Sequence, residues 1–311
     1  MMIRRGTAAL TTALLGASLC VAAAPADAST GGVFPPLRQN LVSYYDFEHP
    51  VPGDPSREAD SGRSGTTINL INGGAAMRVR DGERRHAIQL GQVNPSAKGN
   101  DDWKAGVFSA SGVPSLHAFS SAKGATLAGW FKMTGTNPSP NTETSNPSDV
   151  YNAIGLSGLL TGDSDGHAVR ALLEIIEVSG KLHVVALGRR VDGSKSQTFA
   201  ASEDWQSVLP QNTWVHLAAT FDYDTGEMAL YKDGKPLDGF YTTAGDPWGL
   251  EGAPEPDLTS ATDPRGIKIG GSYPQNTAEK NPCNCRMDGL MFLDRPLTPK
   301  EAAIQYKFAN R

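Results

Sequence analysis

Positive charge is not in excess in this chain of 311 residues, and long apolar runs are absent after its first 28 residues. Lys and Arg number 28 against 33 Asp and Glu, which gives a formal net charge of −5. Proteins that bind nucleic acids or anionic membranes do so through basic patches. A span of the bilayer needs about 20 mostly apolar residues. The sequence therefore predicts no nucleic-acid partner and no membrane insertion.

The first 28 residues have the pattern of a secretory signal peptide. Two arginines precede a mostly apolar run, which is followed by an Ala-Asp-Ala cleavage motif. A membrane anchor is the alternative, but the run is short and ends at Pro25. A lipoprotein anchor at Cys20 is a second alternative, and Leu19 stands where such sites have a small residue. We expect a secreted, extracellular protein.

Cysteine is scarce in the remaining chain, residues 29–311, which we expect to form one domain. Cys283 and Cys285 are separated by a single asparagine. Export favours a disulfide between them as a brace of the loop, although a bridge across one residue closes a very small ring. Free thiols and half of a metal site are the alternatives, and an isolated pair of cysteines is weak evidence for zinc.

Residues 213–238 carry the clearest structural pattern. Apolar and polar side chains alternate from Val215 to Phe221, as in a strand with one buried face. A turn containing Gly226 leads to a second alternating run. Asp233 and Gly234 then suit a tight hairpin turn. The pattern predicts an antiparallel sheet.

Further strand patterns run along the rest of the chain. A capping box with proline at the first helical position predicts a short helix after Thr298. Two polar insertions, residues 134–149 and 239–264, interrupt the strands, and loops of this length are either functional or disordered. The other expected strands lie at residues 41–47, 68–71, 87–90, 125–133, 154–160, 171–178, 181–187, 267–269 and 287–293.

Three of these segments resemble the laminin-G-like, concanavalin A-like jelly-roll domains. They are W-x-H-x-A-x-T-F-D with L-Y-K-D-G-K from Trp214, the strand ending in W-F-K at Lys132, and D-G-L-x-x-x-x-R-P-L-T-P-x-E from Asp288. The resemblance implies an all-β fold, a two-sheet antiparallel β-sandwich with a short C-terminal helix. Members of the family bind glycans or proteins, often with a calcium ion, and related sandwiches cleave polysaccharides.

The resemblance also implies a structural calcium site. In the family such an ion often lies where the D-S-x-G loop meets the closing strand, so Asp60 and Asp288 are the candidate ligands, with Asp46 as a third. Calcium prefers carboxylate and carbonyl oxygens. The alternative is that these acids are turn residues that accept hydrogen bonds from their own backbone.

Known catalytic motifs are lacking. Glu174 and Glu177 could be a carboxylate pair for glycoside hydrolysis, but residues three apart on a strand face opposite sides. His183, Arg189 and Arg190 cluster on one strand and its end, where they could bind an acidic sugar or could be solvated charges of an edge strand.

Aromatic residues in expected loops are the remaining ligand candidates. Trp103, Tyr151, Trp248 and Tyr273 could stack on sugar rings, although single surface aromatics are also common. We expect a lectin-like glycan-binding protein. The alternatives are an extracellular polysaccharide lyase or glycoside hydrolase, and a module that binds an extracellular protein.

Overall fold

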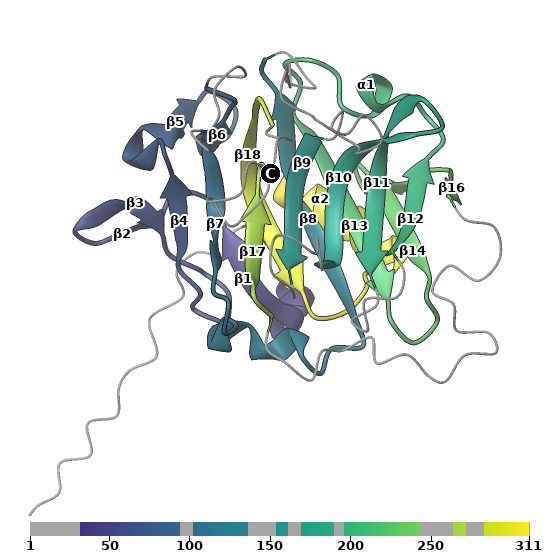
Figure 1. Cartoon of the computed structure of the whole chain (residues 1–311), viewed down its shortest axis with the longest axis horizontal. Helices are drawn as coiled ribbons and strands as arrows, with labels where there is room; N and C mark the ends of the chain where they lie inside the picture. The colour runs from purple at the N-terminus through teal and green to yellow at the C-terminus, as the bar shows by residue number, and fades with distance from the viewer. Residues whose placement is uncertain are drawn as a thin grey trace, which may run out of the picture.

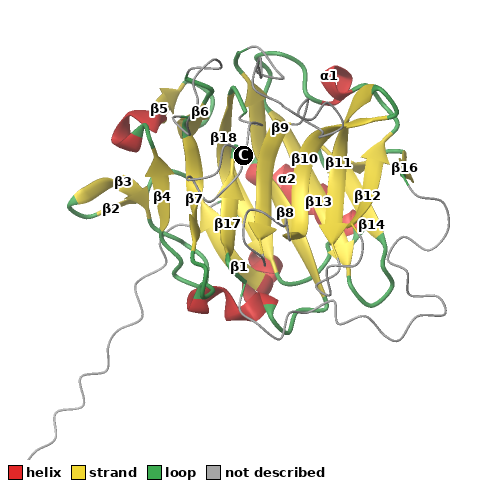
Figure 2. Ribbon diagram, viewed as in Figure 1, coloured by secondary structure: helices red, strands yellow, loops and turns green. Residues whose placement is uncertain are grey.

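The structure, a computed structural model, is a sandwich of two antiparallel sheets (Figures 1 and 2). It describes residues 32–93, 102–135, 154–160, 169–189, 196–242, 264–271 and 283–310. The sheets have eight and ten strands. The predicted all-β fold is therefore confirmed.

The eight-stranded sheet has the order β15-β14-β13-β8-β18-β6-β5, and β1 pairs with β18. In the predicted hairpin, Leu217 pairs with Lys232 and Phe221 with Met228. Asp233 and Gly234 form the tight turn with positive φ angles of 49° and 74°. The strands are β1 (Leu41–Tyr45), β5 (Arg78–Asp81), β6 (Arg85–Leu90), β8 (Gly124–Met133), β13 (Val215–Asp222), β14 (Met228–Lys232), β15 (Lys235–Pro236) and β18 (Cys285–Leu293).

The ten-stranded sheet has the order β16-β12-β11-β10-β9-β17-β7-β4-β3-β2. Ser179 and Gly180 turn the chain between β10 and β11, which form a hairpin. The strands are β2 (Pro50–Val51), β3 (Asp54–Glu58), β4 (Ile68–Ile71), β7 (Lys104–Phe108), β9 (Ile154–Leu160), β10 (Val169–Val178), β11 (Lys181–Arg189), β12 (Ser196–Ala201), β16 (Gly239–Tyr241) and β17 (Gly266–Ile269).

The main hydrophobic core fills the space between the sheets. Alternate residues of both sheets point into it, for example Leu217 and Phe221 from β13 and Leu173 and Ile175 from β10. Three 3₁₀ helices, η1 (Pro35–Asn40), η2 (Gly74–Met77) and η3 (Pro114–Phe119), and two α-helices, α1 (Trp205–Val208) and α2 (Pro299–Ala309), complete the described elements. Residues of η2, η3 and α1 contribute to this core.

Helix α2 and η1 cover the outer face of the eight-stranded sheet, behind the strands in the view of Figure 1. Tyr306 of α2 packs on Trp130, with ring centroids 5.9 Å apart. Buried Gln305 accepts a hydrogen bond from the Phe34 backbone N–H and donates one to the Gly32 carbonyl. The predicted capping box at Thr298 is present. One outer face of the sandwich is thus closed by the chain itself.

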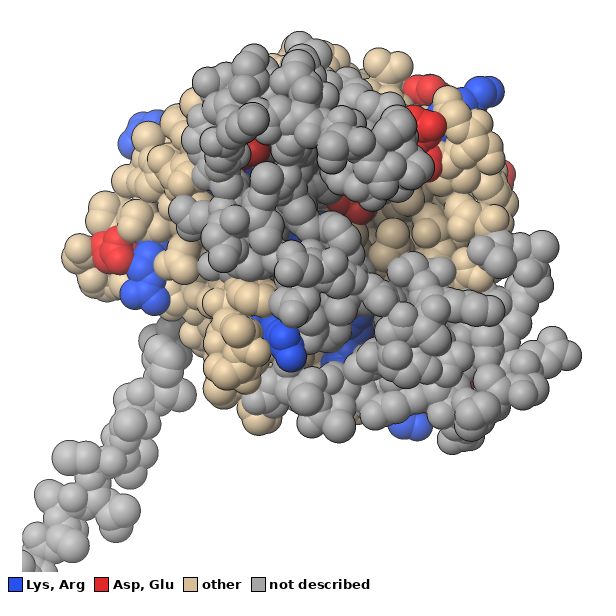
Figure 3. Space-filling view, viewed as in Figure 1, with Lys and Arg blue, Asp and Glu red and all other residues tan. Residues whose placement is uncertain are grey.

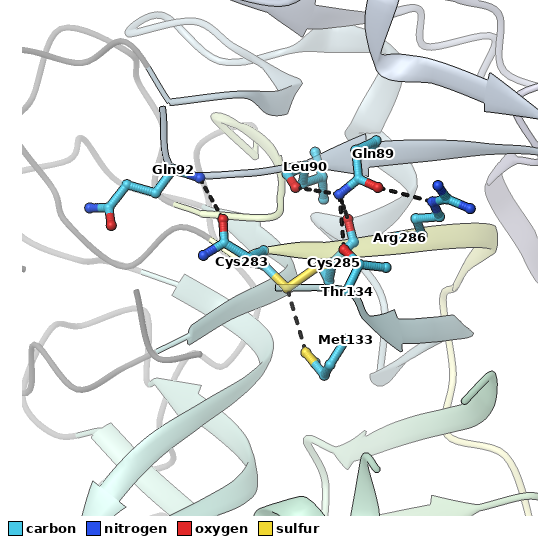
Figure 4. The surroundings of a disulfide bond; sticks show 9 residues. Gln89, Leu90, Gln92, Met133, Thr134, Cys283, Cys285 and Arg286 are labelled. Atoms are coloured by element: carbon cyan, nitrogen blue, oxygen red, sulfur yellow. Dashed lines mark hydrogen bonds between the residues drawn. A yellow bond between two sulfur atoms is a disulfide. The ribbon is translucent and has the colours of Figure 1, made fainter. Parts of the chain in front are cut away.

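A disulfide joins Cys283 and Cys285, as predicted (Figure 4). Both cysteines are fully buried, and Cys283 Sγ lies 4.0 Å from Met133 Sδ. Asn284 between them accepts hydrogen bonds from the backbone N–H groups of Gln92 and Thr134. The bridge therefore lies where the ends of β6 and β8 meet the beginning of β18.

Candidate functional site

The outer face of the ten-stranded sheet is the face on which the described helices do not pack. Side chains alternate along a strand. The residues between those that point into the core therefore point to this outer face. Leu173 and Ile175 of β10 point inward, and Leu172 and Glu174 point outward. Glu177 is exposed and points to the opposite side of β10 from Glu174. The two carboxylates therefore do not converge.

Glu174 and Lys268 form an ion pair on this outer face. Lys268 Nζ lies 3.6 Å from Glu174 Oε1, and the two side chains are only 7% and 6% exposed. Strand β9 runs between their strands, and its Gly158 pairs with Lys268 on one side and Leu172 on the other. A Cβ at Gly158 would lie 3.4 Å from Lys268 Cε and 2.5 Å from Leu172 Cδ1. Glycine therefore leaves the space that these two side chains occupy.

An apolar cluster lies beside the ion pair. Leu160 and Leu172 are its buried members, and Phe108 and Leu187 pack against them. Leu172 pairs with Leu187 across β10 and β11, so the cluster is continuous over neighbouring strands. The face thus places apolar surface directly next to two charged groups.

His183 lies on the same face, toward the β16 edge of the sheet. Its Nδ1 is 2.8 Å from the carbonyl oxygen of Ala201, and the side chain is buried. Its ring meets Phe240 edge-on, with centroids 5.8 Å apart. Phe240 is 41% exposed and, with Val93, is one of two large hydrophobic residues that are exposed in the described part of the chain.

The other ligand residues expected from the sequence have varied positions. Trp103 packs against the main core, and its indole fills the space above Gly73, where a Cβ would lie 2.7 Å from the ring. Arg189 is the last residue of β11 and pairs with Ser196. Tyr151, Trp248 and Tyr273 lie outside the described residues, as does Arg190.

A second group of polar residues lies at the edge of the sandwich near β1 and β3. Asp46, His49 and Glu58 each offer one possible metal-ligating atom, and these three atoms lie within 4.8 Å of one another. His49 Nδ1 is 2.8 Å from Asp46 Oδ1. Glu58 pairs with Arg78, which opposes the rise in the Glu58 pKa caused by burial. No sequence pattern points to His49 or Glu58 as ligands, because the triad forms only when the segment after β1 contacts the end of β3.

Asp288 lies close to Asp46 on the outer face of the eight-stranded sheet. Burial raises the pKa of Asp288 to about 8; Arg84 opposes this rise, and the negative charge of Asp46 adds to it. The nearest Arg84 nitrogen is 3.9 Å from the Asp288 carboxylate. The pair with Arg84 therefore does not offset the effect of burial, and the protonated form of Asp288 is favoured near pH 7.

Asp60 occupies a different environment. Its Oδ1 accepts hydrogen bonds from the backbone N–H groups of Tyr44 and Gly62, at 2.7 and 2.6 Å. Its Oδ2 accepts from the Ser64 hydroxyl and the Thr66 backbone N–H, at 2.5 and 3.1 Å. Four protein donors thus hold the Asp60 carboxylate, which organises its own loop in the way expected of a turn residue.

His216 is part of the packing beneath α2. The side chain is buried beside Trp130 and Tyr306, with ring centroids 5.2 and 6.0 Å away. Burial lowers the pKa of His216 to about 3, and the charge of Arg84 adds to this effect. His216 is therefore neutral near pH 7 and is part of the packing beneath α2.

Charges of both signs are scattered over the side of the molecule shown in Figure 3. Lys and Arg form small separate groups among the described residues, and Asp and Glu do the same. None of the helices in the described ranges is both long enough and apolar enough to cross a membrane.

A sequence profile described as the concanavalin A-like lectin/glucanase superfamily matches residues 104–303, more than half of the chain. A comparison with curated protein sequences finds no significant match.

Solved structures with the same fold include a sialidase and two toxin domains. Trypanosoma rangeli sialidase in complex with 2,3-difluoro-KDN is 14% identical with a TM-score of 0.51, and the match covers 86% of this chain and 32% of the sialidase. The binding domain of botulinum neurotoxin DC in complex with rat synaptotagmin II is 11% identical with a TM-score of 0.53, with coverage of 88% and 52%.

The botulinum neurotoxin serotype D binding domain is 12% identical with a TM-score of 0.50, with coverage of 90% and 52%. The chain thus spans about a third of the sialidase and about half of each toxin domain. At these identities the similarity is one of fold.

Proposed function

Because the chain belongs to the concanavalin A-like lectin/glucanase superfamily, we propose that it is a secreted glycan-binding protein that binds its ligand on the outer face of the ten-stranded sheet. The observation that supports this face most is the Glu174–Lys268 pair beside an apolar cluster. Sites for small ligands combine apolar surface with a few fixed polar groups. The opposite outer face is closed by α2 and η1.

Retention of the purified protein on immobilised polysaccharides tests this proposal. Phe240→Ala should weaken binding about tenfold, because Phe240 is an exposed aromatic residue at the edge of the proposed face. Val93→Ala is the matched control, since Val93 is also an exposed large hydrophobic residue and follows β6, a strand of the other sheet. Failure to bind any polysaccharide would refute the proposal.

A polysaccharide-cleaving enzyme is the second candidate, because the superfamily includes glucanases. Release of reducing ends, or of products with the ultraviolet absorbance of unsaturated uronates, would favour it over a lectin. Binding to a protein that persists during glycan competition would instead favour an adhesion module.

We also propose a structural calcium ion, held by Asp46 and Asp288. The support is the chemistry of the two residues, since calcium takes carboxylate oxygens and Arg84, 3.9 Å from the buried Asp288 carboxylate, leaves the pKa of Asp288 raised. Asp60 then has the separate role of ordering its loop through four hydrogen bonds.

A further inference from the structure

An imidazole and two carboxylates meet near the β2–β3 edge of the ten-stranded sheet. Asp46 and His49 lie on the segment after β1, and Glu58 is the last residue of β3. Their possible ligating atoms lie within 4.8 Å of one another. The side chains of Asp46 and His49 are 15% and 29% exposed, whereas that of Glu58 is fully buried. The group is therefore open to solvent on the side of Asp46 and His49.

Backbone contacts hold these three residues together. The His49 N–H donates a hydrogen bond of 2.9 Å to Glu58 Oε1, and the Ala59 N–H donates one of 2.9 Å to the His49 carbonyl. Phe47, which lies between Asp46 and His49 in the chain, is fully buried and has a φ of 58°, so the backbone bends there. The positions of the ligating atoms are thus set by the fold.

Arg78 orients the third member of the group. Its guanidinium donates to Glu58 Oε2 and also to the backbone carbonyls of Phe47 and Pro55, at 3.0 and 2.9 Å. Oε2 is therefore occupied. Oε1 accepts the His49 N–H and, as a carboxylate oxygen, has a second lone pair for an ion. Metal ligands are commonly oriented by such outer hydrogen bonds.

The donor set suits a divalent transition metal better than calcium. Calcium takes oxygen ligands, whereas zinc and related ions combine imidazole nitrogen with carboxylate oxygen. Ligand atoms around a tetrahedral zinc ion lie about 3.4 Å apart, because each bond is about 2.0–2.1 Å long. The separations here bracket that value, since His49 Nδ1 and Asp46 Oδ1 are 2.8 Å apart and the three atoms lie within 4.8 Å.

We propose that Asp46, His49 and Glu58 form a site for one divalent transition-metal ion, such as zinc, with water as a further ligand. The ion takes the place of the hydrogen between His49 Nδ1 and Asp46 Oδ1, and the neutral ring keeps its one proton on Nε2. Asp46 also belongs to the proposed calcium site. Variants at His49 and Asp288 therefore distinguish the two ions.

Titration calorimetry with zinc chloride tests this site on the untagged chain after treatment with EDTA and dialysis. We expect one zinc ion per chain. His49→Gln keeps a hydrogen-bond donor beside Asp46 but removes the imidazole, and it should weaken zinc binding at least about tenfold. The matched control is His86→Gln, because His86 is also part-exposed, and its Nδ1 lies 2.8 Å from a carboxylate oxygen of Glu48. The control should bind zinc as the unaltered protein does.

Several results would overturn the site. They are the absence of zinc binding, binding that His49→Gln leaves unchanged, and binding that His86→Gln weakens equally. Loss of zinc binding in Asp288→Asn would place the ion between Asp46 and Asp288 instead. Pulsed EPR of copper(II), bound to the unaltered protein in place of zinc, needs no variant. A copper signal without a coordinated imidazole nitrogen would refute the proposal even if His49→Gln does not fold.

Discussion

Asp81 shows how a single buried charge connects distant strands of the sandwich. Its Oδ2 accepts a hydrogen bond of 2.8 Å from Arg286, and its Oδ1 accepts one of 3.1 Å from the Trp214 indole. The side chain is only 2% exposed. Burial alone would raise its pKa, but hydrogen bonds from the Glu83 backbone, Arg286 and Trp214 lower the pKa of Asp81 to about 2.

Replacing this carboxylate should destabilise the fold in a way that depends on pH. We expect Asp81→Asn to lower the free energy of unfolding by about 2 kcal/mol near pH 7, because hydrogen bonds to a charged group are lost. A carboxyl with a lowered pKa in the folded state adds stability above its unfolded pKa, near 4, and loses that contribution as the pH falls toward 2. The difference between the two proteins should therefore shrink over this range.

Urea unfolding at a series of pH values measures this effect. Asp224→Asn is the matched control, because Asp224 is an acid in an exposed ion pair and should contribute little at any pH. A difference between Asp81→Asn and the unaltered protein that stays constant down to pH 2 would contradict the assignment.

The candidate site divides between residues that the sequence could and could not identify. Glu174 was recognised as a carboxylate whose neighbour Glu177 faces away, because strand alternation is a local rule. Lys268 lies on another strand, and only the pairing of β17 with β9 brings it to Glu174. A single sequence carries no signal for such contacts between distant strands.

At the scale of elements, local patterns identified the segments whose structure is set by neighbouring residues. The β13–β14 hairpin and α2 both have signals within a few residues, an alternating run with a tight turn in one case and a capping box in the other. Strand β7 lacks such a signal. Its sequence includes Gly106 with a φ of 147°, and its strand structure depends on pairing with β4 and β17.

The capping box of α2 should have a measurable energy. The Thr298 hydroxyl accepts a hydrogen bond from the Glu301 backbone N–H, and the Glu301 carboxylate accepts from the Thr298 backbone N–H. We expect Thr298→Ala to reduce the free energy of unfolding by about 1 kcal/mol in urea. Lys300→Ala, an exposed position in the same turn, should change it by less than about 0.5 kcal/mol. Equal effects of the two substitutions would show that the cap does not stabilise α2.

At the scale of the whole molecule, the described helices pack on the outer face of the eight-stranded sheet and not on that of the ten-stranded sheet. Helix α2 near the end of the chain packs with Phe34 and Gly32 near its beginning. The eight-stranded sheet thereby gains a second hydrophobic layer on its outer side. On the outer face of the ten-stranded sheet, the buried Glu174–Lys268 pair lies beside apolar residues instead, and this contrast is the basis for placing the ligand there.

The proposed calcium ion also belongs to this scale, because Asp46 follows the first strand of the eight-stranded sheet and Asp288 lies in its last. A ligand that binds only the folded state stabilises it by mass action. Excess calcium should therefore raise the melting temperature and EDTA should lower it. Asp288→Asn should abolish that difference, since it removes the carboxylate that calcium would bind.

The variant Asp60→Asn distinguishes a calcium ion held by Asp46 and Asp288 from one held at the Asp60 loop. It should lower the melting temperature, because the neutral amide binds the four donors less well. If Asp46 and Asp288 are the ligands, the variant should still respond to calcium and EDTA. Loss of the calcium response in Asp60→Asn would make Asp60 a ligand, as the sequence predicts. Equal melting of the unaltered protein in calcium and in EDTA would refute the ion at either place.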